Sequence, residues 1–313
     1  MTYHNDLTSF TIAPEPPYNF AANANFITHY RGHEGTDAFD GVTLTRPVDL
    51  GDTVAMVNVR STGTVEEPSL SVTLSGHPGP LSSNTIARVK QQVERVVGAH
   101  GNPRGFYDIA ATEPPLAPLV QQFHGLHLTR ATSLFETIAW AVLGQQISAI
   151  VAATLRRRVT ETYGRSGEVE GQPYALFPRP EDLAGASVEN LRALGLSRRK
   201  AEYAIGLADE FASGRLTEDH LADLDDDEVE RLLLKLRGIG PWTVHWLLIR
   251  GLGRPNALPA GDVALQKTLG ELVNGEPMTP DELVTYADRF RPYRSYLTIY
   301  IFALIRARRV GAA

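Results

Sequence analysis

Over the first third of the chain, hydrophobic and polar positions alternate in short runs. Residues 39–44, 53–60 and 69–74 are rich in Val, Thr and Leu, and each run is bounded by Gly, Pro or acidic residues. This pattern predicts short antiparallel strands. Over residues 81–97 the apolar positions recur every three or four residues instead, which predicts a helix. We therefore expect an N-terminal lobe in which a helix accompanies an antiparallel sheet.

From residue 133 onward, the apolar positions follow the helical period almost throughout. A break at Gly144-Gln145-Gln146 separates two predicted helices, and residues 167–180 are expected to form a loop. The predicted helices span residues 134–143, 149–163, 187–194, 197–213, 225–235 and 293–309, and another begins at Thr279. The sequence thus predicts an α+β protein that is mostly α. We expect the sheet lobe over residues 1–118 and an all-helical core over residues 119–313.

The composition is that of an ordinary globular protein, with 43% hydrophobic and 21% charged residues. The chain contains no cysteine. This excludes disulfides, zinc fingers and cysteine-ligated iron–sulfur clusters. No secretory signal is expected, because the first ten residues lack a basic run followed by an apolar stretch. No run approaches about 18 apolar residues, so we expect no membrane span.

The formal net charge of −6 argues at first against binding to nucleic acid. Its distribution weakens that objection, because residues 217–230 contain eight acidic residues and no Lys or Arg. Without this segment, the region from residue 131 onward is net positive. A solvated acidic helix start in one place leaves a positive face elsewhere. Charge alone therefore decides nothing about the ligand.

The sharpest local signal is the segment LKLRGIGPWT at residues 234–243, between two predicted helices. Gly238 and Gly240 permit a tight hairpin, and Pro241 suits the first turn of the second helix. Backbone amides at such a helix start can bind a phosphate without lysines. A plain helical turn is the alternative, but this context favours contact with a DNA backbone. The expected contacts are Gly238, Ile239, Gly240 and Thr243.

A second signal is the segment LPAGDVALQK at residues 258–267, in which a short Pro- and Gly-containing loop delivers Asp262 to a helix start. Aspartate is common as a helix N-cap, so a structural role is the alternative interpretation. The position of Asp262 favours a functional role, because Asp262 lies one helix and a short loop beyond the hairpin. From there the carboxylate can face the sugar of a nucleotide whose phosphate the hairpin holds.

In this order the two motifs resemble the helix-hairpin-helix base-excision DNA glycosylase superfamily, and more narrowly the DNA-3-methyladenine glycosylase II family. The narrow resemblance rests on five short segments that keep the family's order and span nearly the whole chain. They are Pro16-Pro17-Tyr18, Ala141-Val142-Leu143-Gly144-Gln145-Gln146-Ile147-Ser148, Gly238-Ile239-Gly240-Pro241-Trp242-Thr243, Pro259-Ala260-Gly261-Asp262 and Arg291-Pro292-Tyr293-Arg294-Ser295-Tyr296.

The resemblance implies a sheet lobe followed by two helical lobes with the active cleft between them. The helix-hairpin-helix would lie at residues 226–252, and the last helices, 279–309, would pack back on the core. By similarity, Asp262 takes the catalytic position, and Gln146 fills the gap left by the extruded nucleotide. The family's hairpin also binds a monovalent cation, Na⁺ or K⁺, through backbone carbonyls. These would belong to Leu234, Leu236 and Ile239.

The resemblance further implies a monofunctional enzyme of base excision repair that flips alkylated purines, such as 3-methyladenine and 7-methylguanine, out of duplex DNA and hydrolyses their N-glycosidic bond. The expected partner is double-stranded DNA containing damaged bases, bound by a monomer that is cytoplasmic and nucleoid-associated. In lyase members, the position of Trp242 carries the lysine that forms a Schiff base. Tryptophan there predicts base release without AP-lyase activity, and no cofactor or iron–sulfur cluster is expected for catalysis.

An alkylated purine carries a positive charge, which aromatic faces attract by about 0.5 to 2 kcal/mol each. Trp242 and Trp246 are four residues apart and therefore share one helix face. The resemblance adds Phe26 and Tyr293 to this base pocket. For each ring, core packing is the alternative. His245 lies on another helix face and is expected to be structural or solvent-facing.

Other interpretations stay open at this point. The same reaction on another lesion, such as 8-oxoguanine or hypoxanthine, is the nearest alternative. A non-enzymatic helix-hairpin-helix DNA-binding protein and a purely structural helical protein are the others. The sequence also does not separate two roles for Asp262, which can stabilise the sugar cation or activate the attacking water.

Overall fold

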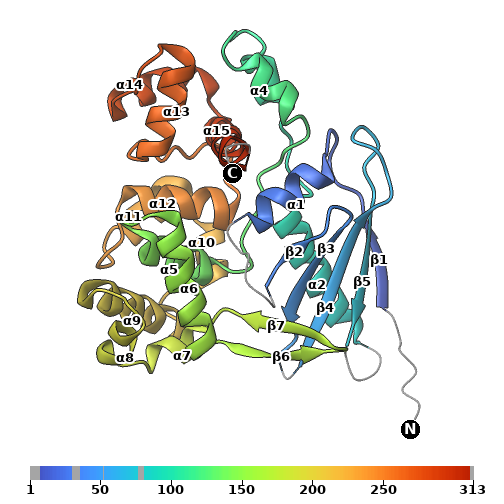
Figure 1. Ribbon diagram of the computed structural model, residues 1–313, viewed down its shortest axis with the longest axis vertical. Coiled ribbons are helices and arrows are strands. Elements are labelled where there is room, and N and C mark those ends of the chain that lie inside the picture. The colour runs from blue at the N-terminus through green and yellow to red at the C-terminus, as the bar shows by residue number, and fades with distance from the viewer. Residues whose placement is uncertain (1–7, 30–35, 52, 77–80, 311–313) are drawn as a thin grey trace.

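A computed structural model describes residues 8–29, 36–51, 53–76 and 81–310 (Figure 1). Its N-terminal lobe is built on a five-stranded antiparallel sheet with the strand order β1-β5-β4-β3-β2. The strands are β1 (Thr8–Ile12), β2 (Ala38–Phe39), β3 (Thr43–Asp49), β4 (Val54–Ser61) and β5 (Leu70–Ser75). The strand predicted over residues 39–44 is divided by a turn, and β1 was not predicted. The antiparallel sheet itself is confirmed.

Alternating apolar residues give this sheet one buried face. Val57 of β4 is opposite Leu74 of β5, and both are fully buried. Helices α1 (Phe20–Thr28) and α2 (Ser83–Val97) cover that face and complete a hydrophobic core that ends at Ala99. Burial of one side of the strands against two helices explains why alternation and helical spacing follow each other in the sequence.

The second core begins earlier than the sequence suggested. Helices α3 (Arg104–Ala110) and α4 (Ala117–Gln122) pack with the C-terminal helices and not with the sheet. Leu116 is fully buried there. Apart from Phe26 of α1, which packs in the second core, the two cores divide between residues 99 and 106, upstream of the predicted boundary at residue 118. Sequence alone does not show what a short helix packs against.

The helices of the second half agree closely with the predicted ones. Ser133 and Ser148 accept backbone N–H groups and cap two of them. The helices are α5 (Leu134–Gly144), α6 (Ala149–Tyr163), α7 (Pro180–Ala184), α8 (Val188–Ala193), α9 (Arg198–Ala212), α10 (Glu218–Asp223), α11 (Asp226–Leu233), α12 (Pro241–Leu247), the π-helical turn η1 (Leu248–Leu252), α13 (Val263–Val273), α14 (Pro280–Ala287), the 3₁₀ turn η2 (Asp288–Phe290) and α15 (Arg294–Val310). Among the helices of the described ranges, none combines the length and the apolarity that crossing a membrane requires.

A β-hairpin interrupts the predicted all-helical core. Strands β6 (Arg165–Val169) and β7 (Gln172–Leu176) occupy most of the segment expected to be a loop, so that prediction was wrong. The hairpin lies between the helices and the sheet in Figure 1. Its apolar residues are few, because only Val169 and its neighbours pack on the sheet residues Val54 and Met56. So short an apolar pattern does not stand out in the sequence.

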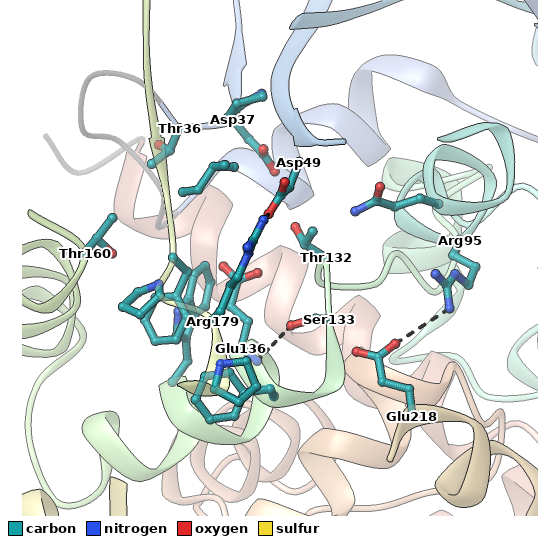
Figure 2. Close-up of a pocket in the computed structure, with 18 of the residues that line it drawn as sticks. Thr36, Asp37, Asp49, Arg95, Thr132, Ser133, Glu136, Thr160, Arg179 and Glu218 are labelled. Atoms are coloured by element: carbon teal, nitrogen blue, oxygen red, sulfur yellow. Dashed lines mark hydrogen bonds and ion pairs between the residues drawn. The ribbon is translucent and has the colours of Figure 1, made fainter. Parts of the chain in front are cut away.

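Charged contacts also attach this hairpin to the sheet lobe. Arg179, just beyond β7, donates to the Asp49 carboxylate at 2.7 and 3.0 Å, and Arg165 of β6 pairs with the same group. Figure 2 shows Arg179 reaching Asp49. The hairpin therefore connects the helical core to the strand β3.

Candidate active site

The helix-hairpin-helix forms where the sequence predicted it. Helix α11 leads into a turn over residues 234–240, and α12 with η1 continues to Leu252. Gly238 has φ +87°, and a Cβ there would lie 2.2 Å from the ring of Tyr203 on α9. A Cβ at Gly240 would meet nothing within 4 Å. One glycine is therefore required by packing, while the other leaves the outer side of the turn open to a ligand.

Gln145 holds the adjacent loop against this hairpin, a role that sequence analysis missed. Its Nε2 donates to the Gly238 carbonyl at 2.8 Å and lies 3.3 Å from the Thr243 hydroxyl. Its neighbour Gln146, the predicted gap-filling residue, is exposed and has φ +57°. The turn that buries one glutamine amide thus presents the other to solvent.

Asp262 reaches the hairpin helix through a hydrogen bond. One carboxylate oxygen accepts the backbone N–H groups of Ala264 and Leu265 at 3.0 Å and caps α13. The other accepts the indole Nε1–H of Trp242 at 2.8 Å. Asp262 is partly exposed, and within the described ranges it forms no ion pair. The side chain is therefore both an N-cap and a carboxylate that faces the hairpin.

Three aromatic rings line up from this carboxylate. The Trp242 and Trp246 centroids are 6.0 Å apart at 69°, which confirms that the two rings share a helix face. Trp246 in turn packs edge-on against Phe302 of α15, with the centroids 5.1 Å apart. Sequence analysis missed Phe302, because its partner lies 56 positions earlier and no local spacing links the two.

Tyr293 lies elsewhere, which corrects its expected place beside the tryptophans. It precedes α15 and is nine residues from Phe302, a rise of about 13 Å along a helix. Its ring contacts Tyr296, with centroids 6.4 Å apart, and packs closely against Gly105 of α3. The ring that α15 contributes next to Trp246 is therefore Phe302.

Phe26 packs against Arg306, which lies one helical turn beyond Phe302 on α15. The guanidinium of Arg306, four residues after Phe302, lies over the Phe26 ring at 3.6 Å from the centroid. The ring of Phe26 is 4% exposed, and no ring contact joins it to either tryptophan in the described part of the chain. The structure thus brings Trp242, Trp246 and Asp262 together, and a place for Phe26 in the base pocket stays a prediction.

His245 lies on another face of the helix that carries the two tryptophans. Its side chain is 24% exposed and lies 4.0 Å from the Glu230 carboxylate. Partial burial lowers the pKa of His245, and the nearby Glu230 opposes that shift. This placement agrees with a structural residue and not with a ligand of the cleft.

Of the three hairpin carbonyls expected to bind a monovalent cation, one already accepts a backbone N–H. Leu236 already accepts the amide of Ile239 at 3.2 Å through its carbonyl. The carbonyls of Leu234 and Ile239 accept no backbone N–H in the turn as described. A carbonyl has two lone pairs, so all three oxygens can ligate an alkali cation. No group of His, Asp and Glu side chains suited to a metal ion occurs among the described residues.

A cavity of about 660 Å³ lies outside this site, between the sheet lobe and the helical core (Figure 2). Its walls include Asp49 and Arg179, Glu136 of α5, and Arg95 of α2 facing Glu218 of α10. Asp262 and the two tryptophans do not line it. The candidate active site is instead the open surface between the hairpin, α13 and α15.

Comparisons with known proteins agree with this arrangement. Residues 139–291 match the family described as HhH-GPD superfamily base excision DNA repair protein. The chain is 29% identical to the DNA-3-methyladenine glycosylase of Bacillus subtilis, over 97% of this chain and 100% of that protein. It is 26% identical to DNA-3-methyladenine glycosylase 2 of Escherichia coli, over 94% and 96% of the two chains. The solved 3-methyladenine DNA-glycosylase of Archaeoglobus fulgidus superposes with a TM-score of 0.78 at 26% identity, covering 94% of this chain and 97% of that one.

Proposed function

Because the chain belongs to the HhH-GPD superfamily of base excision DNA repair proteins and, within it, to the DNA-3-methyladenine glycosylase family, we propose that it is a hydrolase that releases alkylated purines from duplex DNA. Its substrates would be lesions of the 3-methyladenine and 7-methylguanine class. The single observation that carries the mechanism is the 2.8 Å hydrogen bond from the Trp242 indole to the Asp262 carboxylate.

That hydrogen bond joins the two groups the reaction needs. An alkylated purine leaves as a neutral base with the electrons of the glycosidic bond, and positive charge develops on the sugar. Asp262 has no cationic partner among the described residues, so its charge is available to stabilise that sugar or to orient and deprotonate water. Water then forms the bond to C1′, and its proton passes to the carboxylate or to solvent.

The aromatic row supplies selectivity for the leaving base. A cationic purine is attracted to the faces of Trp242 and Trp246 by about 0.5 to 2 kcal/mol per ring. Phe302 supports Trp246 from α15 and takes the place in the pocket that we first expected of Tyr293. Phe26, packed against Arg306, would contribute from the N-terminal lobe. Extrusion of the base costs least where damage has weakened its pairing, so selection begins before the pocket is filled.

The surroundings of the hairpin suit a DNA backbone. Gly240 leaves room beside the start of α12, where amides of residues 238–243 can receive a phosphate. A Na⁺ or K⁺ ion on the Leu234, Leu236 and Ile239 carbonyls would bridge the turn to that phosphate. Gln146, exposed on its turn, would occupy the gap in the duplex. One monomer would suffice for this arrangement.

We further infer that the enzyme lacks AP-lyase activity. A lyase needs a lysine amine to form a Schiff base with the sugar, and position 242 carries Trp. The amine of Lys200 donates to the Leu143 carbonyl at 2.8 Å and so caps the C-terminal end of α5. Lys267 on α13 is 65% exposed and pairs with Glu271 at 3.9 Å. Neither amine contacts Asp262.

The test is base release from duplexes that each contain a single lesion. We expect release of 3-methyladenine and 7-methylguanine, intact DNA strands before alkali, and no borohydride-trapped adduct. Duplexes with 8-oxoguanine or hypoxanthine serve as the comparison. Faster release of either of these would reassign the substrate, a trapped adduct would reassign the chemistry, and binding without release of any base would reduce the chain to a DNA-binding protein.

A further inference from the structure

The far end of the hairpin helix borders two cavities at the junction of the lobes. They have volumes of about 310 and 210 Å³, and both are lined by Arg95 of α2 and by Arg130 of the non-helical segment before α5. From Pro241 to Leu252 the helix rises about 18 Å, so the junction is remote from the hairpin turn. Neither cavity is lined by Asp262 or the tryptophans.

Arg130 is held in place by packing and not by a counter-charge. Its guanidinium lies against Gly253, which has φ +69°, and a Cβ there would be 2.3 Å from Nε. In the described ranges its side chain makes no hydrogen bond and no ion pair. Burial lowers the pKa of Arg130, and the neighbouring charges of Arg95 and Arg254 lower it further. A half-buried cation beside two others is unfavourable unless an anion joins them.

Three carboxylates near Arg130 are already engaged, and a fourth, Asp219, lines the smaller cavity without an ion pair among the described residues. Glu218 accepts the Leu134 backbone N–H at 2.7 Å and lies 4.0 Å from Arg95. Figure 2 marks this ion pair with Arg95. Asp226 lies 3.4 Å from Arg254. Glu94, which lines the larger cavity, lies 3.5 Å from His100 and 4.0 Å from Lys90. Arg95 and Arg254 therefore each have a carboxylate partner, whereas Arg130 has none among the described residues.

We propose that Arg130 and Arg95 bind the phosphate of a small phosphorylated molecule in the larger of the two cavities, which we call the junction pocket. A guanidinium fork matches two oxygens of a phosphate, which makes arginine the usual residue at such sites. The volume of about 310 Å³ lies at the lower end of the range for small-molecule pockets and exceeds the need of a bare ion. Leu128, Pro255 and Tyr293 form its apolar and aromatic wall. The ligand therefore combines a phosphate with an organic, ring-containing body.

The remote position separates this ligand from the DNA substrate. A duplex seated on the hairpin turn has its phosphates at the opposite end of the helix. A DNA phosphate at Arg130 would instead make the duplex affinity depend on this residue, and its loss would reduce the slope of log K against log salt by about one. The proposal does not rest on the glycosylase activity, so each can fail without the other.

The experiment measures thermal unfolding and isothermal titration of the full chain with three probes. These are 5′-dAMP, inorganic phosphate and deoxyadenosine, each compared with chloride at equal ionic strength. We expect 5′-dAMP to raise Tm in a concentration-dependent manner, phosphate to raise it less, and deoxyadenosine to leave it unchanged. Arg130→Gln should weaken 5′-dAMP binding about tenfold or more, the range for a lost charge-assisted hydrogen bond.

A matched control comes from the same helix as Arg95. Arg88 is exposed on α2 and does not line the junction pocket, so Arg88→Gln should bind 5′-dAMP as the unmodified chain does. Should Arg130→Gln fold poorly, Arg95→Gln provides a second variant with the same expected loss. The proposal is overturned if 5′-dAMP acts no differently from chloride. It is also overturned if Arg130→Gln binds 5′-dAMP normally, or if it loses duplex affinity with a smaller salt slope.

Discussion

The carboxylates near the two ends of the helix formed by α12 and η1 differ in their partners. At the hairpin end, the Asp262 carboxylate accepts only neutral donors, two backbone amides and the Trp242 indole. At the far end, Glu218 and Asp226 each lie near an arginine. A carboxylate neutralised by a guanidinium contributes to the fold, whereas one held by neutral donors keeps its charge for a cation that arrives with the substrate.

The largest expected effect tests this contrast directly. Asp262→Asn removes the negative charge, and asparagine remains a good N-cap for α13, so the fold is retained. We expect the single-turnover rate of base release from methylated DNA to fall about 10³-fold, with duplex affinity unchanged. The measurement is quenched release of labelled base, with binding followed in parallel by fluorescence anisotropy.

Glu218→Gln is the matched control at the other end of the helix. Its amide oxygen can still accept the Leu134 N–H, and the ion pair with Arg95 is lost. We expect a decrease in the free energy of unfolding of at most about 1 kcal/mol and a normal rate of base release. Equal losses of activity in the two variants would show that the contrast between the ends has no functional meaning.

A smaller effect is expected from the hydrogen bond itself. Trp242→Phe keeps an aromatic ring beside Trp246 but removes the Nε1–H that donates to Asp262. We expect about tenfold slower base release, because a hydrogen bond to a charged group is lost. Binding of a product duplex should change little, since the stacking ring remains. A rate equal to that of the unmodified chain would mean that the indole does not hold the reactive carboxylate.

The two hairpin glycines sharpen the comparison within one turn. Gly238→Ala places a methyl group against the Tyr203 ring at φ +87°, so we expect the free energy of unfolding to fall by at least about 2 kcal/mol. Gly240→Ala meets no atom within 4 Å, so we expect normal stability and weaker duplex binding. Chemical denaturation and anisotropy measure the two quantities. A destabilised Gly240→Ala protein, or one that binds duplex normally, contradicts the open phosphate site.

Local signals explain how much of the fold could be predicted. Ser148 and the break before it define the start of α6, whereas the residues of the hairpin β6–β7 contain no comparable cap or hydrophobic period. The hairpin forms because Val169 finds Val54 and Met56 on a sheet more than 100 residues earlier. Helix α4 likewise depends on α15. Elements that are stabilised by distant partners leave little trace in their own residues.

The candidate site divides in the same manner. Asp262 and Trp242 were predicted together because both lie in short motifs near the hairpin, and the hydrogen bond joins them. Phe302 and Gln145 were missed because each is defined by a contact across the chain, with Trp246 and with the Gly238 carbonyl. Motifs locate the residues that carry the chemistry, while the residues that position them become visible only after folding.

The smallest expected effect concerns pH and the hairpin end of the helix. Burial holds the pKa of His245 below its usual value, with Arg294 acting in the same direction and Glu230 and Asp226 opposing it. A depressed pKa means that the folded protein favours the neutral ring. The stabilising contribution is therefore complete above the unfolded pKa of about 6.5 and is lost as the pH falls through the lower folded-state value. Urea midpoints between pH 7.5 and pH 5 should decline less in His245→Gln than in the unmodified chain. Because the buried His127 has a pKa shifted in the same direction, His127→Gln is measured beside it, and an unchanged slope in His245→Gln alone would assign the decline to His127.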